Sequence, residues 1–118
     1  MNSSNEDNIR PWGFYENLED DKTHKVKRIT VYPGKRLSLQ SHEKRAEHWF
    51  ILQGQAIVTL NSKEHRLGAG DCIDINKKDL HRIENIGDEN VVFIEVQTGE
   101  YFGEDDIKRY EDDFGRCD

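Results

Sequence analysis

The feature that most limits how this chain can fold is a series of short apolar stretches separated by turn residues. Residues 56–60, 72–75 and 91–97 have the length and composition of β-strands. The segments between strands, such as 61–64 and 87–90, contain Gly, Asn, Asp or Ser, which favour tight turns. At 118 residues, with 34% hydrophobic and 35% charged residues, the chain can fill one domain. The pattern predicts an all-β sandwich or jelly roll.

A cluster of candidate metal ligands lies early in the chain. Gln40 and His42 are two residues apart on a predicted strand over residues 36–42, so both side chains lie on one face of it. Glu47 stands at the start of the next predicted strand, and a hairpin between the two strands would bring its carboxylate opposite the first pair. Farther along, His81 offers a fourth ligand. Amide, imidazole and carboxylate groups in one place suit a divalent metal.

The residues around this cluster resemble the two sequence motifs of the cupin superfamily. The first motif runs from a Gly through a ligand pair and a Glu to a second Gly, and the second runs from a Gly to a His and then an Asn. The matching residues outside the cluster are Gly34, Gly54, Gly70 and Asn85. The resemblance implies a single cupin jelly-roll barrel whose metal ligands are Gln40, His42, Glu47 and His81. Zinc is the first expectation, and manganese, iron, cobalt or nickel would suit the same ligands.

The two ends of the chain differ from its middle. Residues 1–9 are predicted to form a flexible N-terminal arm before a cupin domain over residues 10–118. Near the C-terminus, Ile107, Tyr110 and Phe114 have the spacing of one face of a helix. Acidic residues before this stripe and a glycine after it suit the two ends of a helix. A short C-terminal helix over residues 104–114 is therefore predicted.

Composition limits the partners and the location of the protein. A formal net charge of −7 argues against nucleic-acid binding, because phosphate backbones require a basic surface. No stretch is long and apolar enough for a transmembrane helix, and the N-terminus lacks the apolar segment of a signal peptide. We therefore expect a cytoplasmic protein without a membrane partner. A disulfide between Cys72 and Cys117 is not expected there, and Cys72 is predicted to be a small buried side chain.

Further motifs narrow the resemblance to the type II mannose-6-phosphate isomerase domain. Among them are Arg-Pro-Trp-Gly at 10–13, Arg-Ala-Glu-His-Trp at 45–49 and Gly-Glu-Asp-Asp-Ile at 103–107. In that family the domain is usually the C-terminal part of a bifunctional enzyme that also has a mannose-1-phosphate guanylyltransferase domain. No Gly-rich nucleotide loop is present, so guanylyltransferase activity is not expected, and Lys44 replaces a His common in the family. The resemblance implies interconversion of mannose 6-phosphate and fructose 6-phosphate for nucleotide-sugar and polysaccharide biosynthesis, by a homodimer.

The expected reaction assigns roles to two more residues. Aldose–ketose isomerisation moves a proton between carbons 1 and 2 through a cis-enediol, which requires a base and polarisation of the sugar oxygens. Arg45, in the predicted turn between the ligand strands, is expected to act in turnover on the enediolate or the phosphate and not to hold the fold or the metal. Glu95 is the candidate base if the face that it shares with Gln97 points inward. Further phosphate candidates are Arg10, Lys27, Lys44 and Arg82. The alternative is a non-catalytic metal-binding cupin that binds a sugar or sugar phosphate as a sensor or scaffold.

Overall fold

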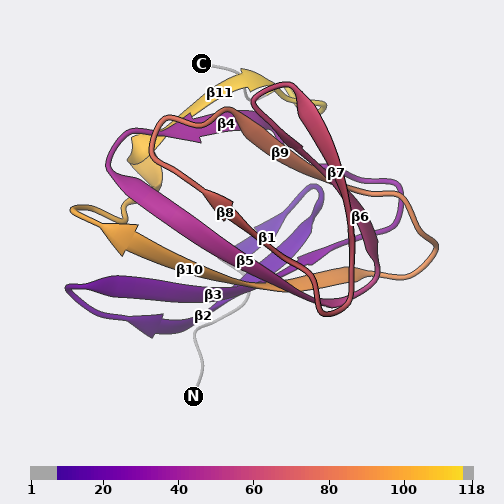
Figure 1. Ribbon diagram of the computed structural model, residues 1–118, viewed down its shortest axis with the longest axis horizontal. Helices are drawn as coiled ribbons and strands as arrows, with labels where there is room; N and C mark the ends of the chain where they lie inside the picture. The colour runs from indigo at the N-terminus through magenta and orange to yellow at the C-terminus, as the bar shows by residue number, and fades with distance from the viewer. Residues whose placement is uncertain (1–7, 116–118) are drawn as a thin grey trace.

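The computed structural model describes residues 8–115, which form two antiparallel β-sheets around one core (Figure 1). The first sheet has the order β1 (Ile9–Arg10), β2 (Gly13–Asp20), β3 (His24–Val31), β10 (Val91–Gly99), β5 (Arg45–Gln53) and β8 (Cys72–Ile75). The second sheet has the order β11 (Ile107–Glu111), β4 (Leu39–His42), β9 (His81–Asn85), β6 (Gln55–Leu60) and β7 (Lys63–Gly68). The predicted all-β jelly roll is confirmed. The predicted arm lies mostly outside the described residues, and Ile9 already belongs to β1.

The interior of the barrel is divided into an apolar part and a polar part. Along β10, Val91 and Phe93 are buried in the apolar part, and Glu95 and Gln97 are buried in the polar part. Strand β5 lies antiparallel to β10 and shows the same division in the opposite direction. The buried apolar residues that form the core are Trp12, Tyr15, Ile29, Val31, Trp49, Ile51, Ala56, Val58, Ile75, Ile83, Val91 and Phe93. Single strands therefore contribute to the core and carry polar side chains to the candidate site.

Gly54 lets the chain pass directly from β5 in one sheet to β6 in the other. Its φ of 94° lies in the region that favours glycine. A Cβ atom at this position would lie 2.6 Å from the carbonyl oxygen of Asn90, which is closer than real Cβ atoms approach backbone. The glycine that ends the first predicted motif is therefore required by the backbone path between the sheets.

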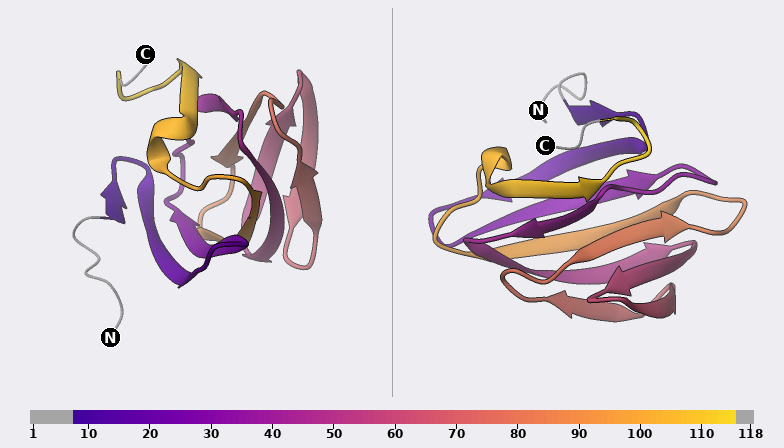
Figure 2. Two further views of the ribbon diagram at one scale, coloured as in Figure 1. Left: turned by 90° about the vertical axis from the view of Figure 1, so that its left-hand side faces the viewer. Right: turned by 90° about the horizontal axis from the view of Figure 1, so that it is seen from above.

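The prediction of a C-terminal helix is wrong. The chain makes one 3₁₀ turn, η2 (Glu104–Asp106), and continues as β11, which pairs with β4 at the edge of the second sheet (Figure 2). Pairing with this edge gives the backbone groups of both strands hydrogen-bond partners, and this outweighs a helical stripe of three apolar residues. The acidic run has a different use, because Asp106 accepts hydrogen bonds from the N–H groups of Glu43 and Lys44 at 3.2 and 3.0 Å. Among residues 8–115, no helix has the length and hydrophobicity to cross a membrane.

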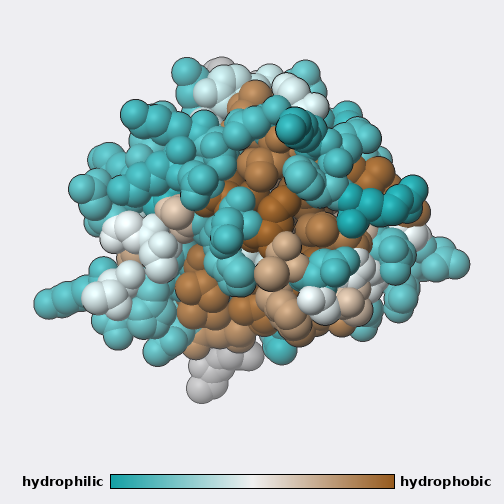
Figure 3. Space-filling view, viewed as in Figure 1, coloured by the Kyte–Doolittle hydropathy of each residue, from teal (hydrophilic) through white to brown (hydrophobic). Residues whose placement is uncertain are grey.

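The outer face of the first sheet is apolar where β5, β8 and β10 run side by side (Figure 3). Phe50 and Leu52 of β5 are 41% and 44% exposed there. Cys72 lies opposite Phe50 and is also exposed, so the prediction that it is buried is wrong. The reason is alternation, since Ile73 and Ile75 take the inward positions of β8. Cys117 lies outside the described residues. The homodimer expected from the sequence stays a prediction.

Candidate functional site

Strand β5 brings three functional side chains together through alternation. Arg45, Glu47 and Trp49 are two residues apart, so all three point into the barrel while Ala46 and His48 lie on the other face. Nε of Arg45 donates to Oε2 of Glu47 at 2.8 Å, and Nε1 of Trp49 donates to Oε1 at 2.9 Å. Both carboxylate oxygens of Glu47 are therefore held in place by residues of the same strand.

His42, Glu47 and His81 form a buried cluster that can hold a metal ion. One ligand atom from each residue lies within 4.8 Å of the other two. The predicted hairpin between β4 and β5 is not formed, because these strands lie in opposite sheets and Glu47 is paired with Gln97 and Ile75. The predicted ligands on β4, β5 and β9 instead meet across the interior of the barrel.

The cluster has the protonation states that a metal requires. Burial lowers the pKa of His42 to about 4, so its imidazole is neutral at pH 7. Burial alone would raise the pKa of Glu47, but Arg45 and the neighbouring histidines outweigh this effect and lower the pKa to about 2. Nδ1 of His81 lies 2.9 Å from the carbonyl oxygen of Asp79, a contact that leaves Nε2 as its metal-binding atom.

Gln40 is the fourth predicted ligand, and it lies beside the cluster on β4. It is paired with His81 across the second sheet, and its side chain is buried. The amide nitrogen of Gln40 donates to Oγ of Ser38 at 2.9 Å, which leaves the amide oxygen as its metal-binding atom. Two imidazoles, a carboxylate and an amide oxygen suit a divalent cation and do not select among zinc, manganese, iron, cobalt and nickel.

Arg45 lies closer to the ligands than the sequence indicated. It is the first residue of β5, not part of the preceding turn, and its side chain is only 5% exposed. In addition to its bond with Glu47, its Nη2 lies 2.9 Å from Nε2 of His42. A metal bound at this nitrogen would take the lone pair that Arg45 now contacts. Without a metal, Arg45 holds both Glu47 and His42 in place, so the prediction that it has no part in the fold or the metal site is wrong.

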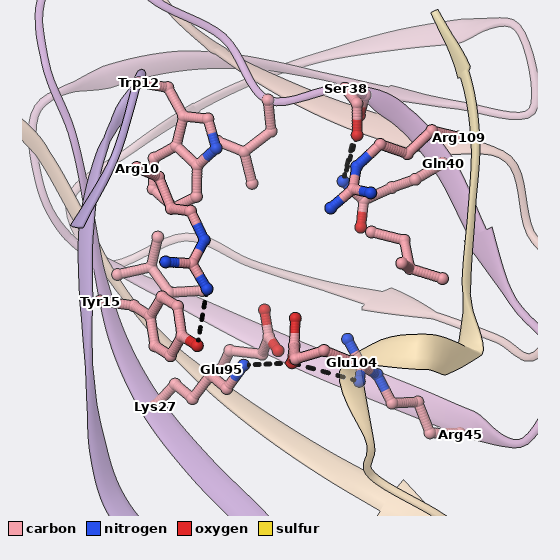
Figure 4. Close-up of a pocket in the computed structure, with 13 residues that line it drawn as sticks. Arg10, Trp12, Tyr15, Lys27, Ser38, Gln40, Arg45, Glu95, Glu104 and Arg109 are labelled. Carbon is pink, nitrogen blue, oxygen red and sulfur yellow. Dashed lines mark hydrogen bonds and ion pairs between the residues drawn. The ribbon is translucent and has the colours of Figure 1, made fainter. Parts of the chain in front are cut away.

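A larger pocket adjoins the candidate metal site of His42, Glu47 and His81 and opens to solvent (Figure 4). The empty space in this pocket is about 480 Å³, open solvent at the mouth included. A smaller cavity, lined in part by Glu47 and His81, shares Gln40, Arg45 and Glu95 with it. A molecule in the pocket would therefore lie next to the candidate metal ligands.

Glu95 projects from β10 into the pocket and is buried. Burial and the nearby charge of Glu47 raise the pKa of Glu95 to about 7. The amide nitrogen of Gln97, two residues along the same face, donates to the Glu95 carboxylate. The carboxyl group can therefore both accept and release a proton near neutral pH.

Cationic side chains from four different strands line the pocket. They are Arg10, Lys27, Arg45 and Arg109. Three of them, Arg10, Lys27 and Arg45, were predicted as phosphate candidates. Of the other candidates, Arg82 lines the smaller cavity, and Lys44 lies over the ring of Tyr101 and does not line the pocket.

Arg109 was missed in the sequence because its segment was predicted to be helical. In β11, Arg109 is paired with Gln40, and alternation brings it and Ile107 to the pocket. The two-residue spacing of Ile107, Arg109 and Glu111 is the sequence pattern that could have predicted a strand here. The same segment also fits a helix through the spacing of Ile107, Tyr110 and Phe114.

Comparison with known proteins gives a family match over nearly the whole chain. The family described as "Mannose-6-phosphate isomerase C-terminal" matches residues 2–112. The mannose-1-phosphate guanylyltransferase ManC of Salmonella typhimurium is 45% identical over 107 residues. The alginate biosynthesis protein AlgA of Pseudomonas aeruginosa is 47% identical over 107 residues. Both alignments cover 91% of this chain and 22% of the relative, so the chain spans about a fifth of the length of these proteins.

Solved structures share the fold at lower sequence identity. A protein with a double-stranded β-helix domain from Klebsiella pneumoniae has a TM-score of 0.75 at 20% identity, covering 92% of this chain and 96% of that chain. The cupin domain of Cnp3 from Schizosaccharomyces pombe has a TM-score of 0.67 at 17% identity, covering 72% of this chain and 64% of that chain. These similarities confirm the predicted cupin fold.

We predict that binding of a divalent metal depends on His81. Removing this ligand in His81→Ala should lower metal affinity by at least about 10- to 100-fold, the loss typical of disturbing a hydrogen-bond partner of a metal ligand. The control is His48→Ala, because His48 follows Glu47 in sequence but faces outward and hydrogen-bonds to Asp74. Elemental analysis and metal titration of the purified proteins measure the effect. Equal metal content in His81→Ala and the parent would contradict the assignment.

Proposed function

We propose, from the premise that this chain belongs to the mannose-6-phosphate isomerase C-terminal family, that it interconverts mannose 6-phosphate and fructose 6-phosphate with a bound divalent metal. The position of Glu95 is the strongest support for this proposal, because a buried carboxyl group with a pKa of about 7 lies beside Arg45 and the candidate metal ligands. The reaction would feed nucleotide-sugar and polysaccharide biosynthesis, and a cytoplasmic location would suit it. The proposal concerns the isomerase alone, since the chain spans about a fifth of its longer relatives.

The proposed reaction transfers a proton between carbons 2 and 1 of the open-chain sugar phosphate. The proton leaves C2 and is delivered to C1 through a cis-enediol, while the proton of the C2 hydroxyl moves to the C1 oxygen, so that C2 becomes the ketone and C1 carries the hydroxyl. This sequence requires a base beside the two carbons and stabilisation of negative charge on the oxygens. A divalent metal, when bound by Gln40, His42, Glu47 and His81, would supply Lewis-acid polarisation of the sugar oxygens.

Glu95 has the properties of the proton carrier in this scheme. Its ionised form would take the proton from C2, and its protonated form would return the proton to C1. A pKa of about 7 keeps both forms accessible at neutral pH. Because Glu95 is only 5% exposed, the proton that it holds is shielded from bulk water during the transfer.

Arg45 has a donor available for the negative oxygen of the enediolate. Its Nε and Nη2 contact Glu47 and His42, whereas its buried Nη1 has no hydrogen-bond partner within the described part of the chain. Nη1 lies 3.9 Å from a carboxylate oxygen of Glu104. One guanidinium group can therefore hold Glu47 through Nε and donate to a substrate oxygen through Nη1 at the same time.

A coupled assay with mannose 6-phosphate tests the proposed function. We expect turnover by the metal-loaded protein, loss of turnover after removal of the metal with a chelator, and recovery when the metal is restored. Unphosphorylated mannose should be a poorer substrate. Binding of mannose 6-phosphate without turnover would overturn the isomerase proposal and favour the alternative, a non-catalytic sugar-phosphate binder.

We predict that Arg45→Ala has separate effects on stability and rate. In the metal-free protein the carboxylate of Glu47 loses its buried partner, which typically costs about 3–5 kcal/mol, so the melting temperature should fall. In the metal-loaded protein turnover should fall about 100- to 1000-fold. The control Arg36→Ala removes an arginine that is 37% exposed and pairs with Asp113, and it should cost about 0–1 kcal/mol and leave the rate unchanged. Parental turnover in Arg45→Ala would exclude the proposed role.

We predict that Glu95→Gln abolishes turnover and removes a pH dependence of the rate. In the parent, kcat should rise with pH through a pKa of about 7, because the base must be ionised. Glu64→Gln, on the exposed face of β7, is the control. A variant that keeps both the rate and its pH dependence would exclude Glu95 as the base.

The same variant has a stability readout whose sign follows from the raised pKa of Glu95. Between pH 4.5 and about 7 the folded protein binds more protons at Glu95 than the unfolded protein does. This residue therefore makes the fold less stable as pH rises through that window. Glu95→Gln should remove this contribution, seen as a difference in melting temperature that grows with pH.

A further inference from the structure

We propose that Arg109 binds the phosphate group of the substrate and thereby selects phosphorylated over unphosphorylated sugars. This inference rests on the proposed function and assigns the phosphate to one part of the pocket. Arg109 was not among the site residues predicted from the sequence, and its position in the pocket supports the assignment.

Arg109 enters the pocket from β11, the strand next to a candidate metal ligand. The register of β11 pairs it with Gln40 of β4. Figure 4 shows its guanidinium group beside Ser38 and Gln40, whereas the ion pair of Lys27 and Glu104 lies at the other end of the pocket. A sugar phosphate whose reacting carbons lie near the candidate metal ligands could therefore place its phosphate against the guanidinium group of Arg109 in the same pocket.

The described part of the chain leaves hydrogen-bonding capacity of Arg109 unused. Within residues 8–115, its buried Nε has no hydrogen-bond partner, and its guanidinium group forms no ion pair within 4.0 Å. By contrast, Lys27 lies 2.8 Å from Glu104, and Arg45 lies 2.8 Å from Glu47. A buried donor without a partner is costly unless a ligand supplies the acceptor. A phosphate oxygen supplies an acceptor and a compensating charge together.

A second guanidinium group in the pocket also favours an anion there. Arg10 also projects into the pocket, where its Nη2 donates to the hydroxyl of Tyr15 at 3.2 Å, and it adds a second guanidinium group. The carboxyl groups of Glu95 and Glu104 would repel a phosphate placed beside them. Arginine suits this task because its planar group can donate two parallel hydrogen bonds to a phosphate.

Arg109→Gln, Arg109→Lys and the control Lys108→Gln test the assignment. Lys108 is the neighbouring residue on β11 but faces solvent. We expect the KM for mannose 6-phosphate to rise about 10- to 100-fold in Arg109→Gln with kcat near the parental value, since one charged hydrogen-bonding group is lost. Inhibition by inorganic phosphate should weaken by a similar factor. Arg109→Lys should lie between the parent and Arg109→Gln, and Lys108→Gln should match the parent.

Calorimetric titration with mannose 6-phosphate and with inorganic phosphate separates this inference from the proposed function. If the parent binds mannose 6-phosphate without turnover and Arg109→Gln binds it more weakly, the isomerase proposal fails and the phosphate subsite stands. If the parent turns over and Arg109→Gln keeps the parental KM and phosphate affinity, the subsite is excluded and the isomerase stands. Should Arg109→Gln fail to fold, as judged by its melting curve, Arg109→Lys decides: a raised KM supports the subsite and an unchanged KM excludes it.

Discussion

Arg45 and Glu47 form an ion pair of 2.8 Å inside the barrel, where their side chains are 5% and 2% exposed. Removing one partner of such a pair typically costs about 3–5 kcal/mol, so neither residue can change alone without loss of stability. With its second oxygen bonded to Trp49, the carboxylate of Glu47 is fixed before any metal binds. The histidines of β4 and β9 then face a ligand in a constant position. The candidate metal centre thus depends on contacts within a single strand.

Trp49 packs against both the hydrophobic core and the candidate site, so the geometry of the site depends on the stability of the core. The centroid of the Trp49 ring lies 4.8 Å from the ring centroid of Phe93 in the core and 5.7 Å from the ring centroid of His81 in the site. The polar part of the barrel is tolerated because most of its groups are paired with one another. Two of the buried donors that lack a hydrogen-bond partner in residues 8–115, Nη1 of Arg45 and Nε of Arg109, belong to residues that line the pocket. Such donors are satisfied when a ligand provides acceptors.

Alternation within single strands could be read from the sequence, and it put Gln40 and His42 on one face and Glu47 on the next strand. Which strands become neighbours could not be read, because pairing depends on residues far apart in the chain. Strands β4 and β5 are consecutive but lie in opposite sheets, so local spacing does not show that their ligands meet across the interior. The C-terminal segment fits a helical and a strand period over a few residues, and the edge of β4 decides between them. Arg109 went unnoticed for this reason.

The two-residue spacing of Arg45, Glu47 and Trp49 has an evolutionary consequence. Inserting or deleting one residue between Arg45 and Trp49 would reverse the facing of the residues on one side of the change, so the three side chains would no longer share a face. Such a change would separate the ligand from its ion-pair partner or from the core aromatic residue in one step. Substitutions can instead alter the pocket one side chain at a time. Divergence among proteins with this arrangement should therefore proceed by replacement within the strands, and changes in chain length should be confined to the loops.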